Sequence, residues 1–226
     1  ALPEGLIAER PARPRDAARL LLVGDELVHH RVRDLPQLLA PGDLLVVNDT
    51  KVLPARLRGR RGEAKIEATL HKRLGVGCWR AFVRPGKRLR VGDEIVFADD
   101  LAASVVARPS GREADLHFGL ADEALQEALE RHGAMPLPPY IPRTDGADAQ
   151  DREDYQTLFA DQPGAVAAPT AALHFTPELV AALEARGISI VKVTLHVGAG
   201  TFLPVDVEDT EDHRMHSEYG EVSARA

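Results

Sequence analysis

Short stretches of alternating polar and apolar residues fill the middle of the chain, between residues 57 and 117. They lie at 65–70, 78–83, 94–97, 102–107 and 115–118, and glycine or proline stands in the gaps between them. Several short strands separated by turn signals at this spacing favour a small antiparallel barrel or sandwich. No helical pattern of useful length occurs within the run. The centre of the chain is therefore predicted to be all β.

The two flanking regions combine helix and strand patterns. On the N-terminal side we predict two strands, a helix and a buried strand, at 17–23, 27–32, 35–39 and 44–47. On the C-terminal side we predict three helices and a buried strand, at 122–132, 151–159, 176–187 and 188–195. The expected fold is an α/β domain with an inserted small antiparallel β-barrel domain, α+β overall. The predicted segments are 1–56, 57–134 and 135–226.

Composition narrows the class of protein. Cys78 is the single cysteine, which excludes an internal disulfide framework and a multi-thiolate zinc site. No apolar run reaches the length of a bilayer span, and the first fifteen residues lack the apolar core of a signal peptide. These features favour a cytoplasmic protein without membrane contact.

The net charge of −7 argues weakly against nucleic acid as a partner, because phosphate contacts come from Lys and Arg. A local basic patch can override the total charge. Two dense basic runs occur, one at Arg56, Arg58, Arg60 and Arg61 and the other at Lys87, Arg88 and Arg90. Taken alone, the two runs also fit a pair of solvated strand faces.

Four polar stretches adjoin predicted strands, at 48–50, 166–176, 194–202 and 213–219. In an open α/β sheet, ligands bind at the carboxyl ends of strands. The N-terminus of the helix at 176–187 would suit a carboxylate, and Gly198 and Gly200 allow a close ligand approach. Each stretch taken alone also fits a structural role, as a turn, a helix cap or a packed histidine.

Together and in this order, these stretches resemble the S-adenosylmethionine:tRNA ribosyltransferase-isomerase family of the queuosine pathway. The resemblance is carried by 14–16, 41–57, 83–87, 135–141, 151–156, 167–176, 193–202 and 213–219. It implies an α/β domain interrupted by a small barrel. It also implies transfer of the ribosyl portion of S-adenosylmethionine onto the 7-aminomethyl-7-deazaguanine wobble base of tRNA, giving epoxyqueuosine with release of adenine and methionine. A monomer without a metal cofactor is expected.

That chemistry requires proton transfer near neutral pH, for which histidine is suited. The catalytic candidates are His174, His196, His213, His216 and Asp49. The candidates for binding S-adenosylmethionine are Asn48, Thr170, Thr176, Gly198, Gly200 and Thr201. The candidates for binding the tRNA substrate are Tyr140, Arg143, Tyr155, Glu218, Tyr219, Arg56, Arg58 and Lys87.

Two other classes of function remain open. The four histidines could serve a metal-dependent hydrolase, although their spacing lacks the i, i+4 pair of a zincin helix. The resemblance further implies that family members continue past Ala226. A non-catalytic RNA-binding fragment is therefore the third hypothesis.

Overall fold

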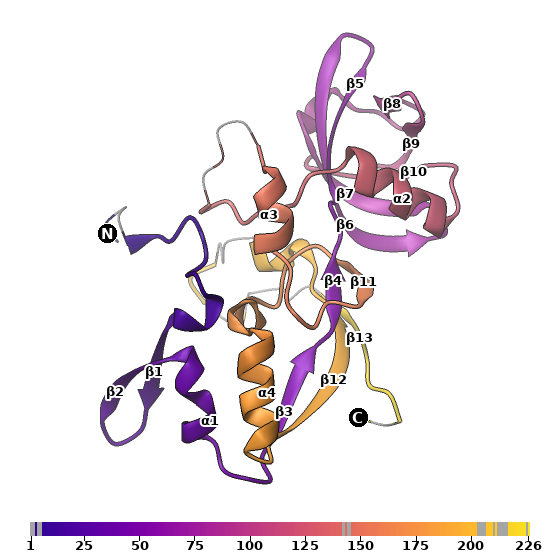
Figure 1. The fold of residues 1–226 in the computed structure, drawn as a ribbon. Coiled ribbons are helices and arrows are strands. Elements are labelled where there is room, and N and C mark those ends of the chain that lie inside the picture. Colours follow the sequence, from indigo (N-terminus) through magenta and orange to yellow (C-terminus); the bar gives the residue numbers. More distant parts are fainter. Residues whose placement is uncertain are drawn as a thin grey trace.

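The computed structural model describes residues 3, 6–141, 143, 146–202, 207–209, 211, 217–224 and 226. Six antiparallel strands close into a barrel in the order β10-β7-β6-β5-β8-β9 (Figure 1). The strands are β5 (Arg56–Arg61), β6 (Ala64–Gly75), β7 (Cys78–Arg84), β8 (Glu94–Ala98), β9 (Leu101–Ala107) and β10 (Glu113–His117). The predicted barrel is confirmed.

Strand alternation fills the interior of the barrel. Along β5 and β6, Leu57, Ala68 and Leu70 are fully buried, whereas the intervening side chains face outward. Helix α2 (Asp122–His132) covers one side of the barrel with Leu125 and Leu129, both 1% exposed. The barrel strands and α2 therefore share one hydrophobic core.

The chain enters and leaves the barrel at one place. Arg56, at the start of β5, exchanges backbone hydrogen bonds of 3.1 and 2.8 Å with Ala134, which follows α2. Next to them, a Cβ added to Gly133 would lie 1.8 Å from the carbonyl oxygen of Pro54. Only glycine fits this approach, so the two crossing segments lie side by side.

The remainder of the chain carries a three-stranded sheet of β3 (Leu44–Asn48), β12 (Ser189–His196) and β13 (Tyr219–Glu221). Strands β3 and β12 are parallel, and β13 is antiparallel to β12. β4 (Thr50–Val52) and β11 (Gln162–Ala165) form a parallel pair, while β1 (Arg19–Val23) and β2 (Leu27–Arg31) form a hairpin. Together with the helices beside it, this sheet confirms the α/β character expected of the flanking regions.

The α-helices of this part are short, and several 3-10 turns lie between the elements. They are α1 (Leu35–Leu38), α3 (Ala149–Asp154) and α4 (Pro177–Ala185), with η2 (Arg15–Ala17), η3 (Val32–Asp34), η5 (Thr170–His174) and η6 (Ala199–Phe202). In the barrel, η4 (Gly86–Arg88) follows β7. Helix α3 begins earlier than predicted and ends at Asp154, because Asp148 and Asp151 form a capping box at its start. Across the described residues, no helix is long and apolar enough to cross a membrane.

The predicted burial of β3 and β12 on both faces is wrong. Leu44 and Val46 are each 56% exposed, and Leu195 is 40% exposed. The opposite face is covered, because α4 and the aromatic rings of Phe159 and Phe175 pack against it. An apolar run marks a strand in either case, so the sequence pattern could not distinguish one covered face from two.

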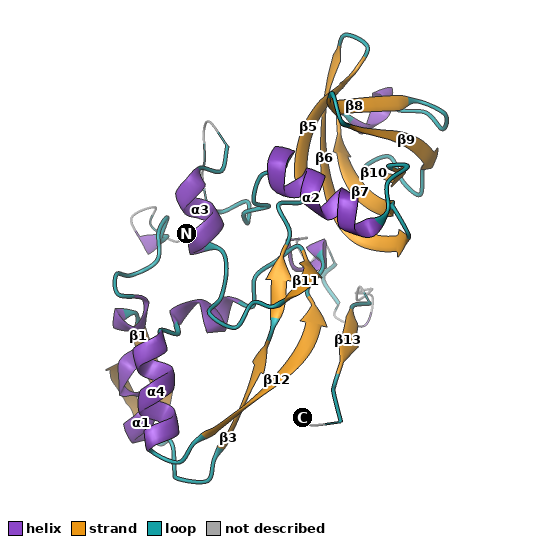
Figure 2. Cartoon of the chain, turned by 45° about the vertical axis from the view of Figure 1, so that its right-hand side comes forward, coloured by secondary structure: helices purple, strands orange, loops and turns teal. Residues whose placement is uncertain are grey.

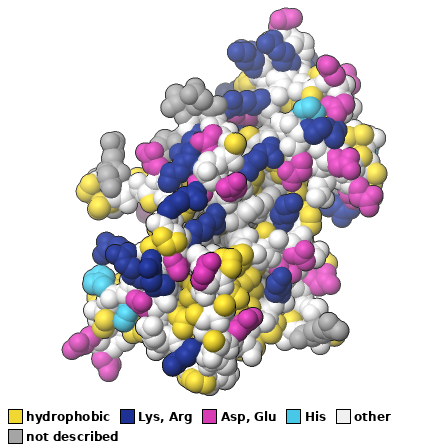
Figure 3. Space-filling model, viewed as in Figure 1, with side chains coloured by type: hydrophobic (Ala, Val, Ile, Leu, Met, Phe, Trp, Pro, Cys, Tyr) yellow, Lys and Arg dark blue, Asp and Glu magenta, His cyan; other side chains and the backbone are white. Residues whose placement is uncertain are grey.

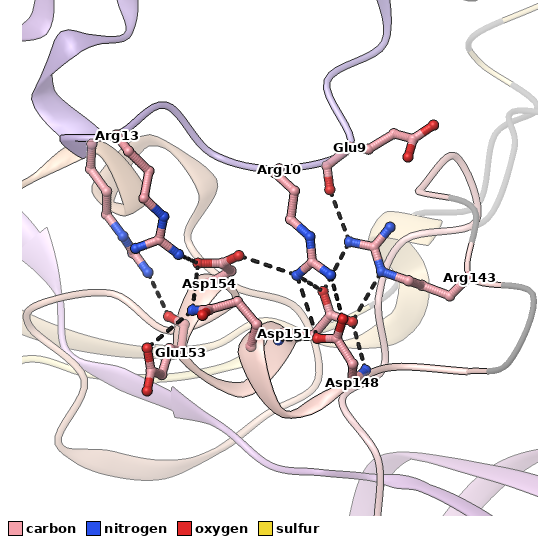
Figure 4. Close-up of polar contacts among 10 residues, drawn as sticks. Glu9, Arg10, Arg13, Arg143, Asp148, Asp151, Glu153 and Asp154 are labelled. Atoms are coloured by element: carbon pink, nitrogen blue, oxygen red, sulfur yellow. Dashed lines mark hydrogen bonds and ion pairs between the residues drawn. The ribbon is translucent and has the colours of Figure 1, made fainter.

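A cluster of ion pairs joins the N-terminal segment to α3 (Figure 4). The side chain of Asp151 is only 2% exposed and receives Arg10 at 2.8 Å and Arg143 at 3.0 Å. Beside it, Arg13 lies 2.6 Å from Asp154, and Arg10 also pairs with Asp148. These opposite charges hold residues 10–13 against a helix about 140 positions further along the chain.

Candidate active site

A cavity of about 850 Å³ lies between the barrel and the three-stranded sheet. The carboxyl end of β12 points toward the barrel (Figure 2). This end supplies His196 and the following Gly198 and Gly200, while the segment into β13 supplies Glu218 and Tyr219. Five of the predicted site residues thus line one cavity, at the sheet edge where α/β folds bind ligands.

His196 is held on several sides. Its Nδ1 lies 2.7 Å from the hydroxyl of the fully buried Thr50, on β4. The ring of Tyr219 stacks with the imidazole at a centroid distance of 6.1 Å. Burial lowers the pKa of His196, and the nearby charge of Asp49 opposes this shift. A neutral imidazole with a fixed ring can accept a proton from a bound ligand.

Asn48 and Asp49 align β12 with the end of β3. The Asn48 side-chain amide donates to the carbonyl of Leu195 at 2.8 Å, and its oxygen accepts from the Leu195 N–H at 3.0 Å. Asp49 accepts from the hydroxyl of Thr194 at 2.7 Å and is 9% exposed. Both side chains were predicted to act on the ligand, and here their described contacts fix the strand that carries His196.

The loop after β12 is fixed by Glu218. One carboxylate oxygen of Glu218 accepts a 2.9 Å hydrogen bond from the backbone N–H of Gly198. A Cβ added to Gly198 would lie 3.7 Å from the carbonyl oxygen of His71, on β6. The glycine loop therefore runs along the barrel wall. Thr201, predicted to bind S-adenosylmethionine, is exposed at the end of this loop.

The barrel wall of the cavity was not predicted from the sequence. His71 on β6 lies 3.2 Å from Glu113 on β10, and its ring stacks on Phe82 at 4.3 Å. Arg80 on β7 pairs with Asp115 at 2.7 Å. In the sequence these residues occupy the polar positions of alternating strands, which face out of the barrel. Charge on one face of a predicted strand was therefore the only signal that could have pointed to them. Only the strand register brings them together.

Three of the predicted residues lie on the segment before α4. Thr170 and His174 begin and end η5, and Thr176 accepts from the N–H of Leu179 at 3.2 Å. Thr176 is therefore confirmed as the N-cap of α4. His174 is half-buried and is not among the described residues that line the cavity, and burial together with the charge of Arg15 lowers its pKa.

Three of the predicted substrate contacts are also not among the described residues that line the cavity. Tyr155 is 4% exposed in a core with Met135 and Leu137, and burial raises its pKa to about 12. Arg143 is committed to Asp151, whereas Tyr140 is 58% exposed on the proline-rich loop. A direct ligand contact by these three residues stays a prediction.

His213 and His216 lie outside the described residues, so their proximity to His196 stays a prediction. Within the part of the chain that is described, no three His, Cys, Asp or Glu side chains group in a way that would hold a metal ion. The interpretation as a histidine-rich hydrolase therefore gains no support from this part of the molecule.

The two basic runs meet on the barrel. Arg61 at the end of β5 donates to the carbonyl of Arg88 at 2.7 Å and pairs with Asp93. Arg60 and Lys87 are exposed nearby, and Lys and Arg side chains gather over this end of β5 (Figure 3). The basic residues of the two runs differ in how freely they could contact a ligand. Arg58 lies 3.6 Å from Glu67, and Arg56 is half-buried at the start of the strand.

The lowered pKa values of His174 and His196 predict a loss of stability in mild acid. Both folded pKa values lie below the ordinary 6.5, so below about pH 6.5 the unfolded chain binds protons that the folded chain does not. Stability is present above this pH and is lost as the pH falls. His174→Gln should reduce this loss, measured as the change in urea midpoint between about pH 7.5 and about pH 5.5.

The exposed His29 on β2 supplies a matched control. His29→Gln should retain the full loss of stability. An unchanged loss in His174→Gln would show that this histidine is not held neutral by the fold.

Comparison with known proteins places the whole chain within one family. A family model described as "Queuosine biosynthesis protein" matches residues 1–226. Proteins named S-adenosylmethionine:tRNA ribosyltransferase-isomerase are 61% identical in Methylocella silvestris and 60% identical in Rhodospirillum rubrum, each over 99% of this chain. The chain spans 65% of the length of each of these relatives.

Among solved structures, a Thermotoga maritima S-adenosylmethionine tRNA ribosyltransferase is 34% identical. The match covers 88% of this chain and 57% of that chain, with a TM-score of 0.34.

Proposed function

This chain belongs to the queuosine biosynthesis protein family, and from that premise we propose that it carries the site of a tRNA ribosyltransferase-isomerase. The reaction moves the ribosyl portion of S-adenosylmethionine onto the 7-aminomethyl-7-deazaguanine base of tRNA. The product is epoxyqueuosine, and adenine and methionine leave. The observation that carries the proposal is the cavity in which His196 faces a polar barrel wall.

The chemistry fits the groups around this cavity. The sulfonium of S-adenosylmethionine acidifies the adjacent C5′ protons, so a neutral imidazole can remove one and start the rearrangement. His196 is the described histidine candidate that lines the cavity, and burial lowers its pKa, which favours the neutral ring. The glycines at 198 and 200 let the ligand approach the backbone after β12.

In this proposal the two walls of the cavity bind different ligands. A cavity of about 850 Å³ has the size of a small-molecule site. The sheet side offers His196 and the glycine loop to S-adenosylmethionine. The barrel side offers His71 and Glu113 to the modified base. The protonated aminomethyl group would be attracted to the carboxylate of Glu113, and the aminomethyl group would lose its proton afterwards.

The proposal is tested by incubating the chain with S-adenosylmethionine and tRNA bearing the aminomethyl-deazaguanine. Released adenine and a nucleoside of the mass of epoxyqueuosine are the expected products. If tRNA binds without adenine release, the RNA-binding interpretation of this chain holds instead. We also propose that the enzyme is a monomer and that it is located in the cytoplasm.

The basic surface on the barrel is proposed to contact the tRNA backbone. Replacing Arg60, Lys87 and Arg90 by glutamate should weaken tRNA binding. Each lost phosphate contact should lower the slope of log K against log salt by about one unit. The measurement is a filter-binding titration at several salt concentrations.

A matched control reverses three exposed cations elsewhere, Arg19, Arg186 and Lys192. This variant carries the same change in net charge and should retain the wild-type salt slope. Equal slopes for the two variants would mean that total charge, and not this surface, governs binding.

A further inference from the structure

Thr50 joins the segment after β3 to the cavity. Its side chain is fully buried and has two described hydrogen-bond partners. One is Nδ1 of His196 at 2.7 Å, and the other is the backbone carbonyl of Gln162, on β11, at 3.5 Å. A hydroxyl has a single proton to donate, whereas a carbonyl oxygen can only accept. Both bonds can form together only if the hydroxyl donates to the carbonyl and accepts from Nδ1–H, and the bond to the carbonyl, at 3.5 Å, is the weaker of the two.

From this arrangement we propose that Thr50 is a positioning residue, which holds His196 in the tautomer with its proton on Nδ1. The Thr50 hydroxyl donates to Gln162 and accepts from Nδ1–H. The lone pair of the imidazole is then on Nε2. No described residue hydrogen-bonds Nε2, and His196 lines the cavity. Which nitrogen of a histidine carries the proton is set by the partner of the other nitrogen.

Gly164, also on β11, fixes the plane of the ring. A Cβ added to it would lie 2.6 Å from Cε1 and 2.7 Å from Nδ1 of His196. The backbone of Gly164 thus packs directly on the imidazole, and Tyr219 stacks with it. A ring packed in this way cannot flip to exchange its two nitrogens without displacing β11 or Tyr219.

The proposed role rests on the proposed function, in which Nε2 accepts a proton from a carbon of S-adenosylmethionine. That proton transfer makes the ring an imidazolium, and Nδ1–H stays bonded to Thr50. A proton on Nε2 would instead make the resting histidine a donor toward the cavity. Thr50 consequently selects between a proton acceptor and a hydrogen-bond donor at the same position.

Nitrogen-15 NMR of histidine-labelled chain at about pH 8.5, where imidazole is neutral, tests the tautomer without any substrate. His196→Asn identifies the His196 signals. We expect a proton on Nδ1 and a bare Nε2 in the wild type and in Thr50→Ser, which keeps the hydroxyl. Thr50→Val should give a mixture of tautomers. A proton on Nε2 in the wild type overturns the proposal, as does an unchanged spectrum in Thr50→Val.

The rate of adenine release provides a second test of the role of Thr50. Thr50→Val should lower kcat about 10- to 100-fold, the range for losing an orienting partner, with little change in KM for S-adenosylmethionine. Thr50→Ser should restore most of the rate. Equal loss in both variants would overturn the positioning role. If no variant and no wild type releases adenine, the proposed function fails, while the NMR result still decides the tautomer.

Discussion

Replacing His196 by glutamine lowers the rate of adenine release by about 10²- to 10⁴-fold, the range expected on removing a general base. Glutamine keeps a polar side chain of similar length, but it cannot take up a proton near neutral pH. The variant should still bind S-adenosylmethionine, since the other residues that line the cavity are unchanged. Single-turnover adenine release, with the chain in excess over the modified tRNA, measures the effect.

His29→Gln, on the exposed face of β2, is the control and should react at the wild-type rate. His174→Gln tests the other described histidine candidate. If His174→Gln abolishes adenine release and His196→Gln does not, the base belongs to η5 and the cavity assignment is wrong.

Removing the buried carboxylate of Asp151 should destabilise the fold by about 1–3 kcal/mol, the cost of taking the partner away from a hydrogen-bonded buried group. Asp151→Ala leaves Arg10 and Arg143 without their shared partner and removes the bond to the N–H of Asp148. Urea unfolding followed by circular dichroism measures the change, and the m-value shows whether the folded state is otherwise preserved.

Asp100→Ala is the matched comparison, because Asp100 pairs with Arg131 at 2.7 Å while half exposed. Exposed pairs of this kind contribute little to stability, because water screens them. A loss in Asp151→Ala no greater than in Asp100→Ala would mean that the N-terminal segment is not anchored by this cluster.

Local patterns in the sequence predicted the architecture, since the elements depend on short-range periodicity. Alternation identified five of the six barrel strands, all except β5, and the Thr176 cap identified the start of α4. Burial of β3 was mispredicted, because whether a second layer covers Val46 depends on residues far along the chain.

The candidate site was predictable on one wall only. His196 and the glycines after it stand at the end of a recognisable strand. The partner of His196 is Thr50, 146 residues earlier, and no local pattern connects the two. The barrel wall depends on the register of β6 and β10 against β7, which places His71 and Glu113 together. Pairing between distant strands carries no periodic signal.

The paired crossing at Arg56 and Ala134 makes the barrel a side branch of the chain. Both ends of the branch emerge from one point, so the remaining polypeptide could be rejoined across a single pair of neighbouring residues. Contacts away from this point also hold the barrel against the rest of the chain, because Val166 packs in the barrel core and Arg152 pairs with Glu130 of α2.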